Sequence, residues 1–473
     1  MVWDILYYTF TIIYSLIAAA LAIVIILENR NPVRTLAWIL VLILFPIVGA
    51  VLYLFLGRDY RRKHLLKDKL VTSSPQIEFS KLADLGIHDN FQKLVRLIDN
   101  NQHSGLYIGN DVQVYAKGNE IFDSLFADLA AARKSIHIEF YIIEEGEVGN
   151  MLHDILLKKA CEGVEVRVIY DYIGGMQLPI EWKKSLLDAG AKIYPFLSAK
   201  SVRGLQYINY RNHRKLVIID GEIGYTGGIN IADRYRLGDH LGLWRDTFIR
   251  VRGSAVGAMQ HAFLVDWNFV GKDEILLLES YVADMPNGGY ADEMVQIVTS
   301  GPDTDWPNIL NGILSAINNA RNKVYIHTPY FIPPESLMLA LESAALSGVD
   351  VRLMLSENSD SLVVSTASRS YIDQLLRAGV RVYLYRYNFL HSKAIVVDDY
   401  VSILGTSNMD IRSFEQNFEV AAFVYGAETA RKLGDLFEED VKICRELNLM
   451  SWRHRSLVRR VRESFARLLS PLF

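Results

Sequence analysis

The sequence predicts an α/β protein built from two similar halves, with a helical hairpin before them and a basic helical tail after them. Three observations lead to this prediction. Short apolar runs alternate with helical segments from about residue 106, segments of the first half recur in the second, and two long apolar runs precede both halves. The predicted boundaries are 1–60 for the hairpin, 61–105 for a basic linker, 106–290 and 291–440 for the two lobes, and 441–473 for the tail.

The composition excludes several classes of protein. The chain has 473 residues, of which 51% are hydrophobic and 22% are charged, and its net charge is -4. These values argue against extended disorder and against a general nucleic-acid binder. The two cysteines, Cys161 and Cys444, lie far apart and outside any Cys/His cluster, so neither a structural zinc site nor a disulfide framework is expected.

Two uncharged runs open the chain. Residues 5–27 and 35–56 are each long enough to cross about 30 Å of hydrocarbon as a helix, and their short connector predicts an antiparallel transmembrane hairpin. A cleaved signal peptide and a re-entrant second run, interrupted by Pro46 and Gly49, are the alternatives. By the positive-inside rule, the basic residues after the second run place the body in the cytoplasm. These residues are Arg58, Arg61, Arg62, Lys63, Lys67 and Lys69.

The two halves contain matching units in the same order. Each unit places a helix, a stop at Ala-Gly or Ser-Gly, and a β-branched strand in succession, which is typical of strands packed beneath helices. Three such matches indicate a duplicated domain and a single two-lobed body. The matching segments are 134–141 with 323–330, 163–168 with 348–353, and 186–194 with 375–383.

The strongest signal is a motif that occurs once in each half. Both copies read His-x-Lys, then four residues, then Asp, and a Gly and an Asn follow at the same spacing. Only about 0.03 chance copies of the His-Lys-Asp pattern are expected in such a chain, so two are significant. Every element recurs 178 residues later. The copies are His213, Lys215, Asp220, Gly227 and Asn230, and His391, Lys393, Asp398, Gly405 and Asn408.

These residue types suit phosphodiester exchange. A His and a Lys two residues apart on a strand share a face. An imidazole can attack phosphorus or protonate a leaving alkoxide, and an ammonium suits a phosphate oxygen. Lys215, Lys393, Asn230 and Asn408 are the candidates to neutralise the phosphate without a metal or other cofactor. A metal site is the rival interpretation, but no metal-ligand spacing accompanies the histidines.

Two acids are candidates to orient the histidines through their second ring nitrogen. Glu419 lies 11 residues after Asn408, and Asp246 lies 16 after Asn230, so each half offers one carboxylate on its next strand. The alternative is a surface carboxylate paired with Arg245 or another neighbour. Asp220 and Asp398 end the motif strands, and we assign them to orienting a loop and to the electrostatics of the site.

The motif pair resembles the mark of the phospholipase D superfamily, and the nearest likeness within it is to the bacterial cardiolipin synthases. It covers nearly the whole chain. The resemblance implies two pseudo-symmetric phospholipase D-like lobes. It also implies transfer of a phosphatidyl group between two phosphatidylglycerol molecules through a phosphatidyl-histidine, giving cardiolipin and glycerol. The segments that carry it are 34–38, 45–46, 227–233, 244–246, 328–333 and 405–413.

The resemblance favours His213 as nucleophile and His391 as acid, although pseudosymmetry leaves the opposite assignment open. Many members of the superfamily carry Ser after the motif glycine, whereas Gly228 and Thr406 stand here, which puts a hydroxyl contact in the first half in doubt. Segment 197–211, which includes Lys200, Arg203 and Arg211, is either a headgroup entrance or an ordinary loop.

The tail predicts a basic amphipathic helix on anionic lipid, because residues 453–467 hold six Arg and one Glu. The alternative is a helix docked on the core with a solvated basic face. Phosphatidylglycerol and anionic membrane lipids are the expected partners, nucleic acid is not expected, and homo-oligomerisation is left open. A hydrolase or nuclease with the same site, and a non-catalytic lipid-binding scaffold, are the alternative functions. The apolar residues at helical spacing are Leu457, Val461, Phe465, Leu468 and Leu469.

Overall fold

The computed structural model describes residues 2–27, 32–53, 82–102, 104–198, 209–271, 273–284 and 289–470. The chain forms two compact units, one of residues 1–60 and 199–209 and one of residues 61–198 and 210–473. Residues 28–31 of the predicted connector, the basic residues from Arg58 to Lys69, and Lys200 and Arg203 lie outside the described residues.

The smaller unit is helical. It contains α1 (Val2–Leu27), α2 (Pro32–Leu44) and α3 (Pro46–Leu52). The second apolar run is therefore not one continuous helix: it breaks at Phe45, because a residue before proline is pushed out of the helical region. Ile25, Leu42 and Tyr53 are buried together, so α1 and the two shorter helices pack on one another. No helix in the described part of the chain combines the length and the apolar character that a membrane span requires.

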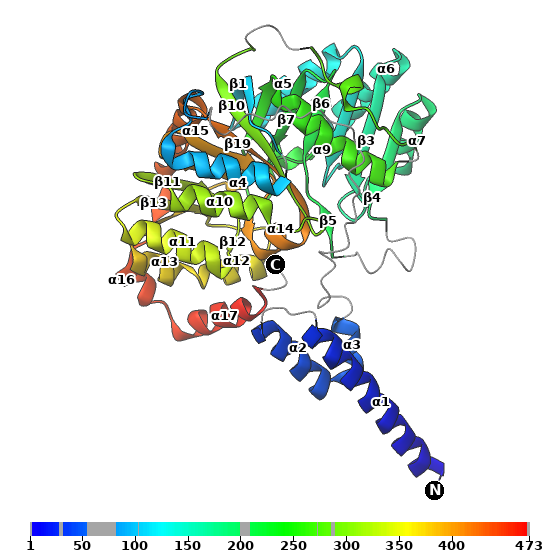
Figure 1. The fold of residues 1–473 in the computed structure, drawn as a ribbon, viewed down its shortest axis with the longest axis vertical. Coiled ribbons are helices and arrows are strands. Elements are labelled where there is room, and N and C mark those ends of the chain that lie inside the picture. Colours follow the sequence, from blue (N-terminus) through cyan, green and yellow to red (C-terminus); the bar gives the residue numbers. More distant parts are fainter. Residues whose placement is uncertain are drawn as a thin grey trace. The chain divides into compact units, whose positions relative to one another are not determined.

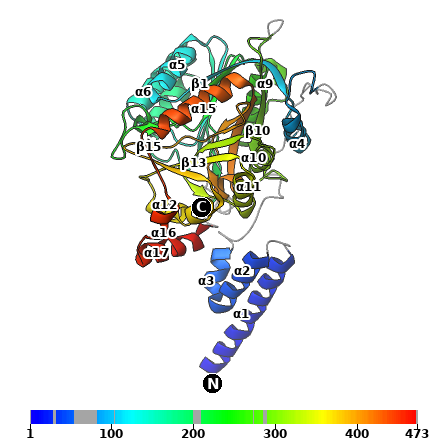
Figure 2. The same ribbon diagram turned by 90° about the vertical axis from the view of Figure 1, so that its left-hand side faces the viewer.

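The larger unit contains one mixed sheet with helices on its faces (Figures 1 and 2). The first half supplies β1 (Tyr107–Tyr115), β2 (Ser135–Phe140), β3 (Glu165–Asp171), β4 (Lys192–Phe196), β6 (Leu216–Ile219), β7 (Ile223–Gly227) and β9 (Phe248–Arg252). The second half supplies β10 (Glu293–Ser300), β11 (Lys323–His327), β13 (Asp350–Ser356), β14 (Arg381–Tyr385), β16 (Ala394–Val397), β17 (Val401–Gly405), β19 (Asn417–Tyr425) and β20 (Cys444–Glu446).

Apart from the edge strand β20, the strands of the second half follow one another in the reverse order of the corresponding strands of the first half. The order across the sheet runs β20-β14-β13-β11-β16-β17-β19-β10-β1-β9-β7-β6-β2-β3-β4, and the two halves meet where β1 pairs antiparallel with β10. The three segment matches in the sequence correspond to the regions of β2 and β11, β3 and β13, and β4 and β14, which pair in parallel within each half. The predicted α/β fold with a mixed sheet flanked by helices is confirmed.

The helices of the first half are α5 (Gly118–Ala131), α6 (Glu147–Cys161), α7 (Ile180–Asp188) and α9 (Ala255–Val270), with short helices η5 (Asp233–Tyr235) and η6 (Leu278–Tyr281). Those packed with the second half are η4 (Asp89–Phe91), α4 (Gln92–Gln102), α10 (Asn308–Asn318), α11 (Glu335–Leu346), α12 (Leu362–Arg369), α13 (Ile372–Ala378), α14 (Ile411–Glu415), α15 (Ala427–Val441), α16 (Leu449–Arg453) and α17 (Leu457–Leu468). Five strands of two residues each complete the described body: β5 (Arg211–Asn212), β8 (Trp244–Arg245), β12 (Phe331–Ile332), β15 (Phe389–Leu390) and β18 (Met409–Asp410).

Residues 82–102 differ from the predicted linker. Leu94, Val95 and Ile98 of α4 are buried in the core of the second half, and the Gln102 side chain bonds to Thr299 of β10. These apolar residues follow helical spacing, which is the signal of a helix packed on a core. This segment therefore belongs to the second half, although it precedes the first half in the chain.

Candidate active site

A short strand comes directly before each motif histidine and pairs with the other half of the protein. Strand β5 pairs in parallel with β19, and the His213 amide donates to the carbonyl oxygen of Phe418 at 2.9 Å. Strand β15 pairs in parallel with β8, and the His391 amide donates to the carbonyl oxygen of Arg245 at 2.8 Å. Both motifs therefore converge on the boundary between the halves.

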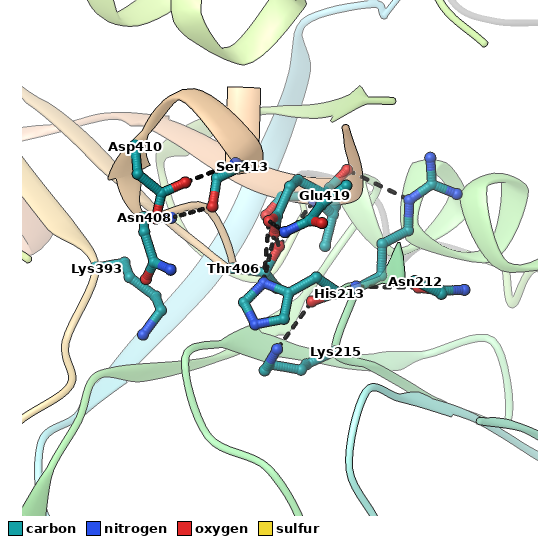
Figure 3. Close-up of polar contacts among 12 residues, drawn as sticks. Asn212, His213, Lys215, Lys393, Thr406, Asn408, Asp410, Ser413 and Glu419 are labelled. Carbon is teal, nitrogen blue, oxygen red and sulfur yellow. Dashed lines mark hydrogen bonds and ion pairs between the residues drawn. The ribbon is translucent and has the colours of Figure 1, made fainter. Parts of the chain in front are cut away.

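Each histidine contacts the acid of the opposite half. His213 Nδ1 lies 3.0 Å from both carboxylate oxygens of Glu419 (Figure 3), and His391 Nδ1 lies 2.6 Å from Oδ2 of Asp246. Both acids are buried, so they are not the surface carboxylates of the alternative interpretation. Arg245 instead pairs with Asp440 at 2.9 Å. With Nδ1 engaged, Nε2 is the nitrogen left for a substrate in each ring.

The two lysines lie beside their histidines and are buried. Lys215 Nζ donates to the carbonyl oxygen of His213 at 2.9 Å, and Lys393 Nζ lies 3.1 Å from His391 Nδ1. Burial lowers the pKa of Lys215 to about 7 and that of Lys393 to about 8. The charge of Lys393 also lowers the pKa of Lys215, and the charges of Lys215 and His213 lower the pKa of His391. The two motifs therefore form one electrostatic site.

Burial favours the neutral form of both imidazoles. It lowers the pKa of His213 to about 4, with Glu419 opposing the fall, and it lowers the pKa of His391 well below its usual value. The two acids differ. Burial raises the pKa of Asp246 to about 6, whereas the pKa of Glu419 falls below its usual value because His213 and Lys215 outweigh the effect of burial. A neutral imidazole whose Nδ1 is held by a carboxylate is suited to nucleophilic attack through Nε2.

The two predicted phosphate-binding asparagines are not equivalent. The side chain of Asn230 is already engaged, since its oxygen accepts from the Ile142 amide at 3.2 Å and its nitrogen donates to the Tyr235 hydroxyl at 3.0 Å. The buried side-chain oxygen of Asn408 has no hydrogen-bond partner among the described residues. The structure thus gives Asn230 a role in holding the Tyr235 side chain and leaves Asn408 as the candidate for a substrate.

Asp220 and Asp398 lie at the far ends of the motif strands. Asp220 accepts from the backbone amides of Arg133, Lys134 and Ser135. Asp398 accepts from those of Arg321, Asn322 and Lys323. Each Asp comes seven positions after its His, beyond a strand of four residues, which corresponds to roughly 20 Å of extended chain. The carboxylates therefore hold loops, as the first part of their assignment expected. Their assignment to the catalytic residues stays a prediction.

Residues 125–240 and 313–441 match the family model described as cardiolipin synthase, PLD-like domain, and residues 16–58 match one described as phospholipase D-nuclease N-terminal. The chain is 41% identical to the major cardiolipin synthase ClsA of Bacillus subtilis, over 97% of this chain and 98% of that protein. It is 39% identical to the cardiolipin synthase of Halalkalibacterium halodurans, over 98% of this chain and 93% of that protein.

The chain belongs to the cardiolipin synthase family. The structure also resembles the crystal structure of phosphatidylserine synthase from Haemophilus influenzae, with a TM-score of 0.61 and 15% identity over 80% of this chain and 98% of that one. This second likeness shows the fold alone, and it agrees with the two-lobed α/β body.

The residues after the motif glycines fit the two different acids of this family member. At Gly228, a Cβ atom would lie 2.1 Å from Oδ1 of Asp246, so no side chain can occupy this position while the carboxylate stays in place. The equivalent Thr406 is buried and donates its hydroxyl to the longer side chain of Glu419. A hydroxyl contact is therefore present in the second half, and in the first half, where the sequence left it in doubt, the Asp246 carboxylate occupies the space.

Sequence analysis did not single out the aromatic and arginine side chains around the histidines. The rings of Tyr235 and Trp244 lie 5.7 and 5.2 Å from that of His391, and the ring of Tyr141 lies 5.1 Å from that of His213. Arg234 and Arg412 are also 178 residues apart. The charge of Arg234 lowers the pKa of His391, and its guanidinium pairs with Glu144 at 2.7 Å. The shared offset was the signal that could have identified this arginine pair.

Proposed function

We propose that the chain is a cardiolipin synthase that transfers a phosphatidyl group from one phosphatidylglycerol to a free hydroxyl of another and releases glycerol. The observation that carries the proposal is the crosswise pair of buried His–Lys–carboxylate groups at one site between the halves. Each half supplies a histidine and the acid that orients the other histidine. Such a site can place one imidazole on each side of a single phosphorus atom, as an in-line displacement requires.

The first step forms an enzyme adduct. Nε2 of one histidine attacks phosphorus, an N–P bond forms, and the P–O bond to glycerol breaks. The other histidine gives its proton to the departing oxygen. Lys215 and Lys393 lie where they can neutralise the charge that grows on the non-bridging oxygens, and a bound phosphate anion favours the ammonium forms of these lysines.

The second step reverses the first with a new alcohol. The hydroxyl of a second phosphatidylglycerol gives its proton to the general base, its oxygen attacks phosphorus, and the N–P bond breaks to give cardiolipin. One phosphodiester replaces another, so the reaction needs no nucleotide, and the site needs to exclude water so that an alcohol accepts the phosphatidyl group.

We assign His213 as nucleophile and His391 as acid. Burial favours the neutral form of the His213 ring, and Glu419, which keeps a lowered pKa and contacts Nδ1 with both oxygens, favours the tautomer with its proton on Nδ1 and Nε2 unprotonated. Asp246 has a raised pKa of about 6, so the pair of Asp246 and His391 can hold a proton near neutral pH and pass it to the leaving oxygen. Both observations support the same division of labour.

We also infer that residues 1–60 anchor the protein in the membrane as a two-helix hairpin, with the body on the cytoplasmic side. The support is the pair of uncharged runs, the excess of basic residues after the second run, and the large apolar side chains exposed along α1. A cysteine in the connector, tested with a membrane-impermeant thiol reagent in intact cells, checks the orientation: labelling from outside the cell is expected, and labelling only after lysis contradicts it.

The experiment that tests the function is incubation of the purified full chain with phosphatidylglycerol alone. Cardiolipin and glycerol in equal amounts are expected. Phosphatidic acid would indicate the hydrolase instead, and absence of turnover would indicate the lipid-binding scaffold. His213→Ala and His391→Ala are each expected to abolish transfer, and full turnover by both would refute the site. A phosphatidyl adduct that accumulates in His391→Ala, and not in His213→Ala, would confirm the assignment of the nucleophile.

A further inference from the structure

The C-terminal helix α17 turns its apolar side away from the protein. Leu457, Phe465 and Leu468 are 72%, 67% and 74% exposed, and Val458, Val461 and Leu469 extend this apolar stripe. The buried side of the helix holds Glu463 and Ala466. A surface helix ordinarily packs its apolar stripe on the core, so the orientation here is reversed. The helix does dock on the core, as the alternative expected, but it does so through Ala466 and leaves the apolar residues exposed.

A basic cavity of about 290 Å³ lies along one edge of the stripe, between α13 and the segment from α16 to α17. Its two acids are already paired: Asp373 with Arg377 at 2.6 Å and Glu463 with Arg455 at 2.6 Å. The cavity keeps an excess of positive charge, because five arginines face these two acids. The arginines that line it are Arg377, Arg453, Arg455, Arg460 and Arg467.

Two of these arginines are available for an anion. Neither Arg460 nor Arg467 has a carboxylate partner among the described residues, although the guanidinium of Arg467 lies over the ring of Tyr371 at 4.3 Å. Arg460, Ser464 and Arg467 follow the i, i+4, i+7 spacing of one helix edge. That edge adjoins the apolar stripe, so charge and apolar surface lie side by side on α17.

We propose that α17 docks on the surface of an anionic phospholipid bilayer, with a lipid phosphate in the arginine-lined cavity and the apolar stripe among the acyl chains. Guanidinium groups bind phosphate oxygens through paired hydrogen bonds. A bilayer offers phosphates and hydrocarbon within a few Å of each other, which matches the arrangement on the helix. None of the lining residues belongs to the catalytic site, so this lipid contact is separate from the substrate site and does not rest on the proposed function.

The test places a probe on the stripe of the full chain. Phe465→Cys, in a background with Cys161→Ser and Cys444→Ser, is labelled with an environment-sensitive fluorophore. The protein is reconstituted in vesicles of phosphatidylcholine with or without phosphatidylserine, an anionic lipid that the proposed reaction does not consume. We expect a blue shift and severalfold protection from an aqueous quencher only in the anionic vesicles. The same label at the exposed Leu346 on α11 is the control and is expected to stay quenched in both.

Charge variants test the cavity. Arg460→Gln with Arg467→Gln is expected to remove most of the protection, because each basic residue near an anionic surface contributes about fivefold to the association. Arg431→Gln with Lys432→Gln on α15 removes the same charge elsewhere and is expected to leave the protection intact. Added inorganic phosphate alone is expected to cause no blue shift.

Three results would overturn the proposal: equal quenching in both kinds of vesicle, equal loss in the two double variants, or protection in detergent that disappears on dilution, which would assign the stripe to a second copy of the chain. Turnover of short-chain, soluble phosphatidylglycerol separates this proposal from the proposed function. The Arg460→Gln, Arg467→Gln variant is expected to keep that activity. Loss of protection on bilayers by a variant that retains this activity is therefore due to the docking surface and not to the catalytic site.

Discussion

Adding a single methyl group at Gly228 is expected to disable the site without touching a catalytic residue. The Cβ atom of Gly228→Ala would lie 2.1 Å from Oδ1 and 2.6 Å from Oδ2 of Asp246, far inside van der Waals contact. Relief requires the carboxylate to move by about 1 Å or more, since ordinary carbon–oxygen contacts begin above about 3.4 Å. A shift of that size breaks the 2.6 Å contact between Asp246 and His391 Nδ1.

The magnitude follows from the contact that is lost. A hydrogen bond to a buried carboxylate contributes about 1.5–3 kcal/mol, and loss of a residue that orients a site histidine costs about 10- to 100-fold in activity. We therefore expect kcat for cardiolipin formation to fall about 10- to 100-fold in Gly228→Ala, with KM nearly unchanged. Thr406→Ser, which keeps the hydroxyl that donates to Glu419, is the matched control and is expected to retain most of the activity.

The assay follows cardiolipin production from phosphatidylglycerol in Gly228→Ala, Asp246→Asn and the double variant. Because both single changes act on the same contact, the activity of the double variant is expected to be only slightly below that of the less active single variant. Full kcat in a folded Gly228→Ala protein would refute the reasoning, and so would losses that multiply in the double variant.

Three further predictions concern other residues of the site. The pKa of Asp246 is raised to about 6 in the folded protein, so the folded state binds the proton more tightly than the unfolded state, and this group lowers the free energy of unfolding as pH rises through that range. Asp246→Asn removes the effect, and its stability relative to the parent should improve by about 2 kcal/mol between pH 4 and pH 7 in chemical denaturation; a flat difference contradicts it. Asn408→Ala is expected to raise KM severalfold, whereas Asn230→Ala, whose amide bonds Tyr235 and Ile142, should mainly lower kcat and stability; the opposite pattern in steady-state kinetics contradicts the assignment. Asp220→Ala removes three backbone contacts and is expected to lower the melting temperature by several degrees with KM unchanged, and a large rise in KM would instead place this carboxylate near the substrate.

Local patterns in the sequence were enough to predict the repeated framework. The matched segments became corresponding strands, because alternating helices and β-branched strands encode parallel pairing through short-range rules. Glu419 and Asp246 could be named as acids on the next strand of each half, yet their partners could not. Those partners depend on β5 and β8, two-residue strands that pair only with the opposite half and leave no periodic signal.

The linker prediction differs from the structure, and the role of Asp220 and Asp398 was hard to predict, for a related reason. Residues 92–102 carry few apolar side chains, and what they pack against lies nearly 200 residues further along the chain, in β10. For the aspartates, repetition in a motif indicated importance without indicating its kind. A carboxylate that caps three backbone amides in a tight loop recurs with the duplication as faithfully as a group that touches the substrate.

The small departures from symmetry explain how two copies of one motif can do unequal work. Asp246 needs an empty position at Gly228, while Glu419, one methylene longer, leaves room for the Thr406 hydroxyl that donates to it. This extra donor, together with His213 and Lys215, keeps Glu419 ionised, whereas Asp246 holds its proton more tightly. His213 is therefore paired with a carboxylate that stays ionised, and His391 is paired with an acid that can share a proton with it. Because each acid comes from the opposite half, neither half alone contains a complete histidine pair, and both specialisations depend on the duplicated chain remaining together.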